Sequence, residues 1–219
     1  METLLPLYAG PLQMPAAWRS VADRGDRDTT VVLNVADGPG RDAPANAAYA
    51  AAAARLDAAG VPMLGYVDLG YAVRPLTEIL GDVGRWTGYP VRGLLLDHAP
   101  TTPFSVGPVA LAIRAARRNG LDRLVLNPAT PPDPVYRDLG VRLCVFEGPW
   151  EEYREWSAHG SRPGDGHLVY GVPRDELDNA GQLLRDRGAG FGLVTDLGLP
   201  APYAGLPSWY PAGAVRVGA

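Results

Sequence analysis

Short apolar runs recur along the whole chain and alternate with segments of helical character. Each run is only a few residues long and is mostly aliphatic, without strict alternation of apolar and polar positions. Continuous apolar runs are typical of strands that are covered on both faces, as in parallel sheets. The eight runs are residues 4–8, 30–35, 61–67, 92–97, 122–127, 141–147, 167–172 and 190–196.

The segments between these runs have the composition of helices. Residues 45–60 are rich in alanine, and residues 45–60, 107–120 and 174–188 each end in a glycine. Glycine commonly ends a helix because it adopts the left-handed conformation at the carboxyl end without steric cost. The pattern therefore predicts strands and helices in alternation.

Eight strands with seven or eight helices in a chain of this size predict an α/β protein, a compact single-domain (β/α)8 TIM barrel over residues 1–219. An open doubly wound sheet is the alternative. Such a sheet normally carries a G-x-G-x-x-G turn after its first strand, and residues 4–15, LLPLYAGPLQMP, lack that spacing. The barrel is the favoured prediction.

A polar or aromatic residue ends most of the apolar runs. Active sites of such barrels lie at the carboxyl ends of the strands, so these side chains are expected to form one ring. The alternative is that a strand reaching the surface becomes polar anyway, or that an Asp caps the next helix. Glu is not a preferred N-cap residue, so this alternative explains Glu147 poorly. The candidate ring is Tyr8, Asn34, Tyr66, Asp97, Asn127, Glu147, Tyr170 and Asp196.

Composition excludes several classes of function. The formal net charge is −4, and all 20 basic residues are arginine. Without lysine the chain cannot form the Schiff bases of lysine-dependent aldolases or pyridoxal enzymes. Without basic clusters it lacks the charges that neutralise nucleic-acid phosphates. We therefore expect no nucleic-acid partner and no cofactor.

Cysteine, histidine and the chain ends add further limits. The single cysteine, Cys144, lies in an apolar run and is expected to be a buried, inert thiol. The three histidines lack the spacing of metal ligands, so no metal site is expected. The amino terminus does not resemble a signal peptide, and no apolar stretch is long enough to span a membrane. These features predict a cytoplasmic protein without a membrane partner; the oligomeric state stays open.

An ordered series of short motifs covers nearly the whole chain. They are LLPLY with Pro15 and Trp18, LNVADGPG, GYVDLGYAVR, GLLLDH, LVLNPATPPDPVY, CVFEGPW and LVTDLG followed by YAGLPSW. In order and spacing this series resembles the spherulation-specific family 4, or spherulin-4-like, proteins. The resemblance implies a (β/α)8 barrel. It also implies a likeness to glycoside hydrolases that cleave α-1,4-linked galactosamine and N-acetylgalactosamine polymers.

The resemblance assigns roles to two acids. Asp97 matches the first member of the family's Asp-Glu pair and is implied to be the nucleophile of a retaining mechanism. Glu147 matches the family's later glutamate and is implied to be the acid/base. A retaining glycosidase needs two carboxyl groups about 5 to 5.5 Å apart. Two positions depart from the family pattern, because His98 replaces the second carboxylate of the pair and Leu69 stands where threonine is usual.

Strand alternation bears on His98. If Asp97 points into the barrel mouth, the next residue starts by pointing towards the helices or the following loop. His98 is then either a residue that tunes Asp97 from outside the mouth or an acid/base partner. The competing interpretation is a hydrogen-bonded structural histidine.

Other polar and aromatic residues are candidates for substrate binding. Asp68 and Arg74 can clamp a substrate or form a structural ion pair, and Tyr66 and Tyr71 match the family motif. Asn34 and Asn127 suit sugar hydroxyls, although Asn127 before a proline can instead fix a turn. Aromatic side chains in the loops after the sixth and eighth strands can stack on sugars or pack in the core; these are Trp150, Tyr203 and Trp209.

Three functions remain open from the sequence. The first is a glycoside hydrolase acting on an amino-sugar polymer or oligosaccharide. The second is an intracellular enzyme of small-molecule biosynthesis that uses Asp97 or Glu147 for proton transfer with His98 as a partner. The third is a sugar-binding protein without turnover. Barrels host many reactions, so the fold alone does not choose among them.

Overall fold

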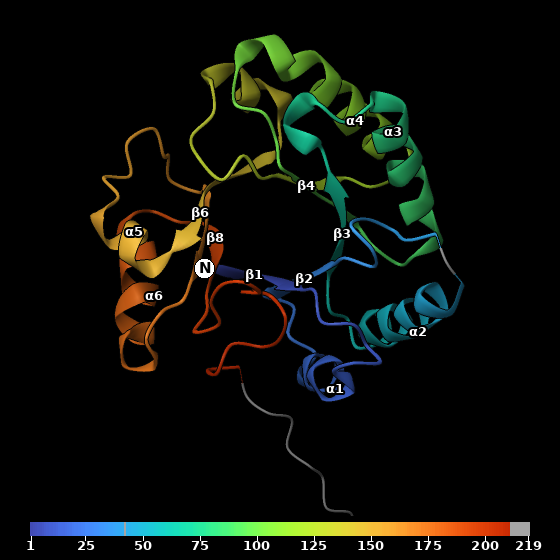
Figure 1. Ribbon diagram of the computed structural model, residues 1–219, viewed down its shortest axis with the longest axis horizontal. Coiled ribbons are helices and arrows are strands. Elements are labelled where there is room, and N and C mark those ends of the chain that lie inside the picture. Colours follow the sequence, from blue (N-terminus) through green and yellow to red (C-terminus); the bar gives the residue numbers. More distant parts are fainter. Residues whose placement is uncertain (42, 211–219) are drawn as a thin grey trace, which may run out of the picture.

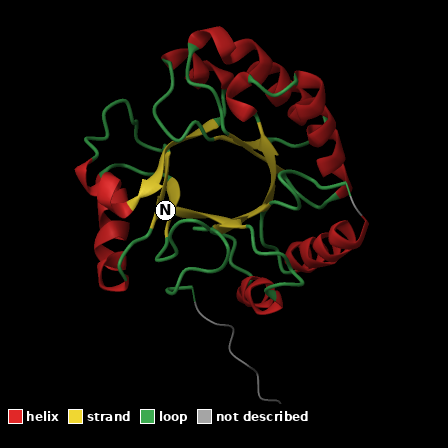
Figure 2. Ribbon diagram, in the orientation of Figure 1, coloured by secondary structure: helices red, strands yellow, loops and turns green. Residues whose placement is uncertain are grey.

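The computed structural model describes residues 1–41 and 43–210, with no side-chain description for residues 43–45. Eight parallel strands close into a barrel in chain order, each pairing with its neighbours and β8 with β1 (Figures 1 and 2). This confirms the predicted (β/α)8 barrel. The strands are β1 (Glu2–Leu7), β2 (Thr29–Leu33), β3 (Met63–Asp68), β4 (Gly93–Asp97), β5 (Arg123–Leu126), β6 (Arg142–Pro149), β7 (Gly166–Tyr170) and β8 (Phe191–Val194).

Helices surround the barrel (Figure 2). The α-helices are α1 (Pro15–Arg24), α2 (Ala43–Ala58), α3 (Leu76–Arg85), α4 (Val106–Arg118), α5 (Trp150–Glu155) and α6 (Leu177–Asp186). Short 3-10 helices add η1 (Gly70–Ala72), η2 (Trp86–Gly88), η3 (Pro103–Ser105), η4 (Pro134–Leu139) and η5 (Arg174–Glu176). Each of the three helices expected to end in glycine ends two residues before that glycine, and the three glycines have positive φ.

The described residues form six α-helices, so the prediction of seven or eight helices is wrong for them. Between β5 and β6 the chain forms only η4, which follows a proline-rich stretch, residues 128–134. Proline lacks the amide hydrogen that a helix interior needs. After β8, residues 195–210 form turns and loop without a helix, and part of this segment returns over the carboxyl ends of the strands, where Tyr8 N–H donates to the Tyr203 carbonyl (2.9 Å).

A close contact sets the position of β3, which carries two candidate residues. A Cβ on Gly65 would lie 2.3 Å from the Trp86 ring, so only glycine lets the indole pack against the strand. The Trp86 Nε1–H donates to the Tyr66 carbonyl (2.8 Å). The fully buried Trp86 thus fixes the strand that presents Tyr66 and Asp68 at the mouth.

An ionic cluster crosses the amino-terminal end of the barrel, opposite the predicted site. Glu2 accepts hydrogen bonds from the Thr30 hydroxyl (2.8 Å) and from Arg142 (2.7 Å). The Arg142 guanidinium also lies 4.0 Å from the centre of the Phe191 ring. These residues come from β1, β2, β6 and β8. Their contacts therefore connect the first strands of the barrel with the last ones, across the pairing of β8 with β1.

His167 lies in β7 and faces the packing layer between the barrel and α5. The residue is fully buried. Its Nδ1 contacts the Tyr153 hydroxyl (2.8 Å), and its Nε2 contacts the Ser161 hydroxyl (3.2 Å). Burial lowers the pKa of His167 from 6.5 to about 4, so the folded protein holds this ring neutral.

We predict that His167 makes stability fall with acidity between pH 6.5 and about pH 4. In that pH window His167 binds a proton in the unfolded chain but stays neutral in the folded chain. The contribution of His167 to the free energy of unfolding is therefore fully present above pH 6.5 and declines as the pH drops. The full shift is equivalent to about 3 kcal/mol. Urea unfolding across this range should show a shallower decline for His167→Asn than for the wild type. Parallel profiles would contradict the prediction.

Candidate active site

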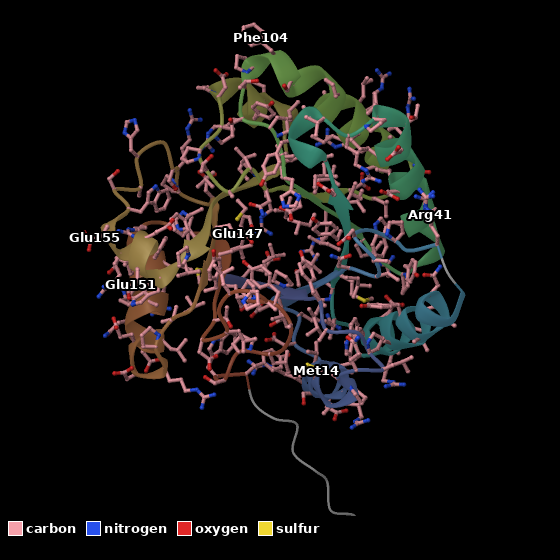
Figure 3. The ribbon with its side chains drawn as sticks, in the orientation of Figure 1. Met14, Arg41, Phe104, Glu147, Glu151 and Glu155 are labelled. Atoms are coloured by element: carbon pink, nitrogen blue, oxygen red, sulfur yellow. The ribbon has the colours of Figure 1, made fainter. Side chains whose placement is uncertain are left out.

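Two acids and one amide form the centre of the mouth. Asp97 ends β4, Asn127 follows β5, and Glu147 lies in β6. The Asn127 Nδ2 donates to Asp97 Oδ1 (2.7 Å) and also to Glu147 Oε2. One nitrogen that contacts both acids places the two carboxylate oxygens within about 5 Å of each other. Figure 3 shows Glu147 on the barrel side of β6, whereas Glu151 and Glu155 lie at the outer edge.

The backbone around Asn127 fixes the direction of its amide. The Asn127 N–H donates to the Leu96 carbonyl (2.8 Å), which continues the pairing of β4 with the chain after β5. Its Oδ1 accepts from the Ala129 N–H (3.1 Å), so the Nδ2 end faces the acids. The Ala129 carbonyl in turn accepts from the Glu147 N–H (3.2 Å). Asn127 therefore fixes the turn and binds both acids, and its contact with a sugar hydroxyl stays a prediction.

A β-bulge in β6 sets the direction in which the Glu147 side chain points. The register with β7 shifts between Cys144 and Phe146, one residue before the acid. Bulges bend a strand and redirect its side chains, and they are frequent near active sites. Cys144 is buried beside this bulge, and burial raises the pKa of its thiol well above the ordinary value.

Tyrosine hydroxyls complete the surroundings of the acids. The Tyr203 hydroxyl donates to Glu147 Oε1 (2.8 Å), so each oxygen of Glu147 has a donor. The Tyr66 side chain hydrogen-bonds Asp97. Tyr8 lies between them, with ring centres 5.7 Å from Tyr66 and 5.6 Å from Tyr203 in edge-to-face contact.

Burial raises the pKa of both acids. The charge of Asp97 raises the pKa of Glu147 further, and the bonds from Asn127 and Tyr203 oppose these effects. At Asp97, His98 and the hydrogen bonds to the carboxylate oppose the rise. Two neighbouring carboxylates repel each other, so ionising one acid favours the protonated form of the other.

His98 lies at the mouth, against the direction that strand alternation predicts. Its backbone has a φ of 49°, which breaks the extended geometry directly after β4. The ring therefore turns back over the strand ends. His98 Nδ1 contacts Asp68 Oδ1 (2.9 Å), and Nε2 lies 3.9 Å from Asp97 Oδ2.

Asp68 and Arg74 do not form the expected ion pair between their side chains. Arg74 donates to the backbone carbonyl of Asp68 (2.8 Å), and its guanidinium pairs with Asp82 and Glu78 of α3. The Asp68 carboxylate instead binds His98 and the Gly70 N–H (2.7 Å). Arg74 therefore binds the backbone at the end of β3, and Glu78 and Asp82 of α3 match its charge.

A cavity of about 560 Å³ adjoins the acids through Tyr8. It lies between the loops that follow β1 and β2 and is lined by Tyr8, Asn34, Gln13, Asp37 and Tyr49, among others. Tyr8 is within electrostatic range of both Asp97 and Glu147, whereas neither acid belongs to the lining of the cavity. Its volume is in the range of small-molecule sites.

Tyr71 and Tyr170 also lie near the acid pair. Tyr71 is 59% exposed and stacks on His98, with ring centres 4.9 Å apart. Tyr170 ends β7 and is half-buried, and after burial itself the charge of Glu147 is the main cause that raises its pKa. Both rings therefore border the mouth.

Three further candidate residues, Trp150, Asp196 and Trp209, bind other parts of the protein. Trp150 is 3% exposed and donates to Glu176 (3.1 Å), so the prediction that it stacks on a sugar is corrected to core packing. Asp196 accepts from the Ser208 N–H (2.7 Å) and from Arg174 (3.0 Å), which ties the loop after β8. Trp209 donates to the Val194 carbonyl (2.7 Å) and borders a surface hollow together with residues of β8 and α6.

Sequence reasoning considered Tyr203 only as a stacking or packing ring. Its hydroxyl is in fact a donor to Glu147, which lies 56 residues earlier in the chain. Nothing local marks this role, because the loop after β8 reaches the mouth only in the closed barrel. Among residues 1–41 and 43–210, no group of three or more His, Cys, Asp or Glu side chains is arranged to hold a metal ion. No helix within those ranges is long and apolar enough to cross a membrane.

Known proteins match both the sequence and the fold. The sequence model of the spherulation-specific family 4 matches residues 2–214. Spherulin-4 of Physarum polycephalum is 29% identical over 152 residues, which are 67% of this chain but only 45% of Spherulin-4. The chain thus matches less than half the length of that relative.

Among solved structures, Sph3 of Aspergillus clavatus, solved in complex with GalNAc, has a TM-score of 0.79 at 23% identity. The match covers 95% of this chain and 94% of Sph3. A β-mannanase of Streptomyces thermolilacinus, solved with mannohexaose, has a TM-score of 0.53 at 14% identity, over 96% and 84% of the two chains. Sph3 shares the barrel fold with this protein. With a family match over nearly its whole length, the chain belongs to the spherulation-specific family 4.

Proposed function

We propose that this protein is a glycoside hydrolase that cleaves α-1,4-linked galactosamine or N-acetylgalactosamine chains, or a related sugar, with retention of configuration. One observation carries the proposal: the Asn127 amide nitrogen joins two partly buried carboxyl groups from different strands. Retaining glycosidases hold their two carboxyl groups about 5 to 5.5 Å apart, whereas inverting enzymes need room for a water molecule between them. The match to Sph3, which was solved with GalNAc, supports the choice of sugar.

In the first step Asp97 attacks the anomeric carbon while Glu147 gives its proton to the departing glycosidic oxygen. The bond from carbon to that oxygen breaks, and a covalent bond from the sugar to Asp97 forms. In the second step Glu147, now ionised, takes a proton from water as the water oxygen displaces Asp97. Two observations support these roles: the charge of Asp97 raises the pKa of Glu147, and both groups bind the same Asn127 amide at one mouth.

Asn127 and Tyr203 position the acids and adjust their charge. Asn127 holds one oxygen of each acid, leaving Asp97 Oδ2 outside its contact. Tyr203 holds the other oxygen of Glu147. The cavity beside Tyr8 supplies space for a sugar unit, with Asn34 and Gln13 as polar groups in its lining.

We predict that Asp97→Asn and Glu147→Gln each lower kcat/KM on α-1,4-galactosamine and N-acetylgalactosamine oligomers by at least about 100-fold. The amides keep the size of the acids but can neither attack carbon nor exchange the proton. Glu155→Gln, on the exposed outer end of α5, is the matched control and should leave the rate unchanged. The readout is product formation by chromatography, with the anomeric form of the first product followed by NMR.

Three outcomes count against this proposal. Turnover that survives both substitutions removes the acid assignment. A first product of inverted configuration excludes Asp97 as a nucleophile. Binding of the oligomers without any product supports the sugar-binding alternative instead.

We also predict that two substitutions move the pH profile differently. Hydrogen bonds from Asn127 lower the pKa of both acids, whereas Tyr203 bonds only Glu147. Asn127→Ala should therefore shift both limbs of the kcat/KM profile to higher pH, because both acids then hold their protons more tightly. Tyr203→Phe should shift mainly the basic limb, which reports the loss of the Glu147 proton. Equal shifts in the two variants would contradict these assignments.

A further inference from the structure

The outward side of α4 carries apolar and basic side chains in one line. Residues three and four apart lie on the same side of a helix. The buried side chains of α4 occupy one side, and exposed residues with this spacing run along the other. We call this exposed line, together with Phe104 of η3 just before the helix, the α4 ridge. Its large side chains are Phe104, Leu111, Arg114 and Arg118.

Phe104 is the most exposed large apolar side chain among the residues described, at 96%. Figure 3 shows it projecting beyond the ribbon at the outer edge of the molecule, whereas Glu147 lies near the middle. Leu111, about two helical turns further along the ridge, is 49% exposed. Single exposed apolar residues are ordinary on protein surfaces, so the neighbours of these two side chains determine what they indicate.

Three arginines follow within about one turn at the end of α4: Arg114, Arg117 and Arg118. Like charges three or four residues apart on a helix repel each other. Within the part of the chain that the structure describes, none of the three forms an ion pair with a carboxylate, and Arg117 donates to the carbonyls of Leu139 (3.2 Å) and Gly140 (2.8 Å). The negative end of the helix dipole favours a cation here, but it does not account for three that repel one another.

A surface hollow of about 530 Å³ lies beside the ridge, between α4 and η4. It is located where the outer ring of helices is incomplete, since the chain between β5 and β6 forms only η4. The lining combines the three arginines with Asp138 and with the apolar side chains of Ala110, Ile113 and Leu139. Three guanidinium groups outnumber one carboxylate, so the hollow is cationic in a chain whose formal net charge is −4.

We propose that the α4 ridge and the adjoining hollow form a contact surface for a membrane of anionic lipids. Phe104 and Leu111 enter the boundary between head groups and acyl chains, which is where amphipathic helices place such side chains. The arginines bind the lipid phosphates, because the planar guanidinium group matches the geometry of a phosphate. The expectation of no membrane partner concerned a spanning segment, and this surface contact needs none.

The combination of side chains favours a lipid surface over other anionic partners. A free phosphate ion would use the arginines but would leave Phe104 and Leu111 in water. A lipid surface uses both kinds of side chain, and it needs no pocket to receive the protruding Phe104. Because α4 lies on the outside of the barrel, the contact also leaves the mouth open (Figure 1).

The test is co-sedimentation of the full chain with vesicles, either of phosphatidylcholine alone or of phosphatidylcholine mixed with phosphatidylglycerol. The protein should partition onto the mixed vesicles at least about tenfold more strongly than onto the neutral ones, because each arginine near an anionic surface adds to the attraction. Raising the salt concentration should reduce this difference, since salt screens the surface potential.

Two variants of the ridge separate the basic contribution from the apolar one. Arg114→Gln with Arg118→Gln, and separately Phe104→Ser, should each lower partitioning onto the mixed vesicles by about tenfold or more. Arg117 is kept, because it binds the backbone of η4. All three replaced side chains are exposed, so thermal unfolding should match the wild type.

Matched controls remove the same groups elsewhere. Arg19→Gln with Arg55→Gln, on the exposed surfaces of α1 and α2, changes the net charge equally and should leave partitioning close to that of the wild type. Leu12→Ser removes an exposed leucine from the loop before α1 and should do the same.

Three outcomes overturn the inference. The first is equal partitioning onto neutral and anionic vesicles. The second is a loss in the control variants as large as the loss in the ridge variants. The third is binding of inorganic phosphate, weakened by Arg114→Gln with Arg118→Gln, without any partitioning onto vesicles; the hollow would then be a site for a small anion.

Discussion

The candidate site depends on two partly buried carboxyl groups that lie side by side and share one amide donor. Two like charges in a poorly solvated site repel strongly, so one acid holds its proton. Asn127 donates to both, and Tyr203 donates only to Glu147. Asp97 has in addition the imidazole of His98 nearby, with Nε2 3.9 Å from Asp97 Oδ2. The two acids therefore have different neighbours.

The barrel supplies that arrangement through the order of its strands. Because β4, β5 and β6 are neighbours in a closed parallel sheet, the residues at their carboxyl ends meet at one edge. The bulge in β6 then turns Glu147 towards the mouth. At the opposite end, the pairing of Glu2 with Arg142 links strands that are distant in sequence. The carboxyl ends of the strands thus carry the candidate site, and the amino-terminal ends carry a contact that helps to close the barrel.

His98 shows how a loop changes what a strand presents. Alternation along β4 predicts that the residue after Asp97 points away from the mouth, yet a left-handed backbone brings the ring back beside the acid. The η1 segment after β3 also contains left-handed residues and supplies Tyr71 as a neighbour of His98, and Asp68 at the end of β3 is the other neighbour. The mouth therefore contains an imidazole that strand geometry alone would have placed elsewhere.

The sequence by itself determined the barrel and the strand ends that form its mouth, because continuous apolar runs and glycine-ended helices are local patterns. It identified Asp97, Asn127 and Glu147 as residues of those ends. Only the tertiary structure decided which candidates meet. Barrel closure brings together the chain segments that form the Asn127 bridge, the Tyr203 bond to Glu147 and the packing around Trp150. A backbone angle sets the direction of His98. Residue spacing carries no information on such contacts, since their energies arise from neighbours far away in the chain.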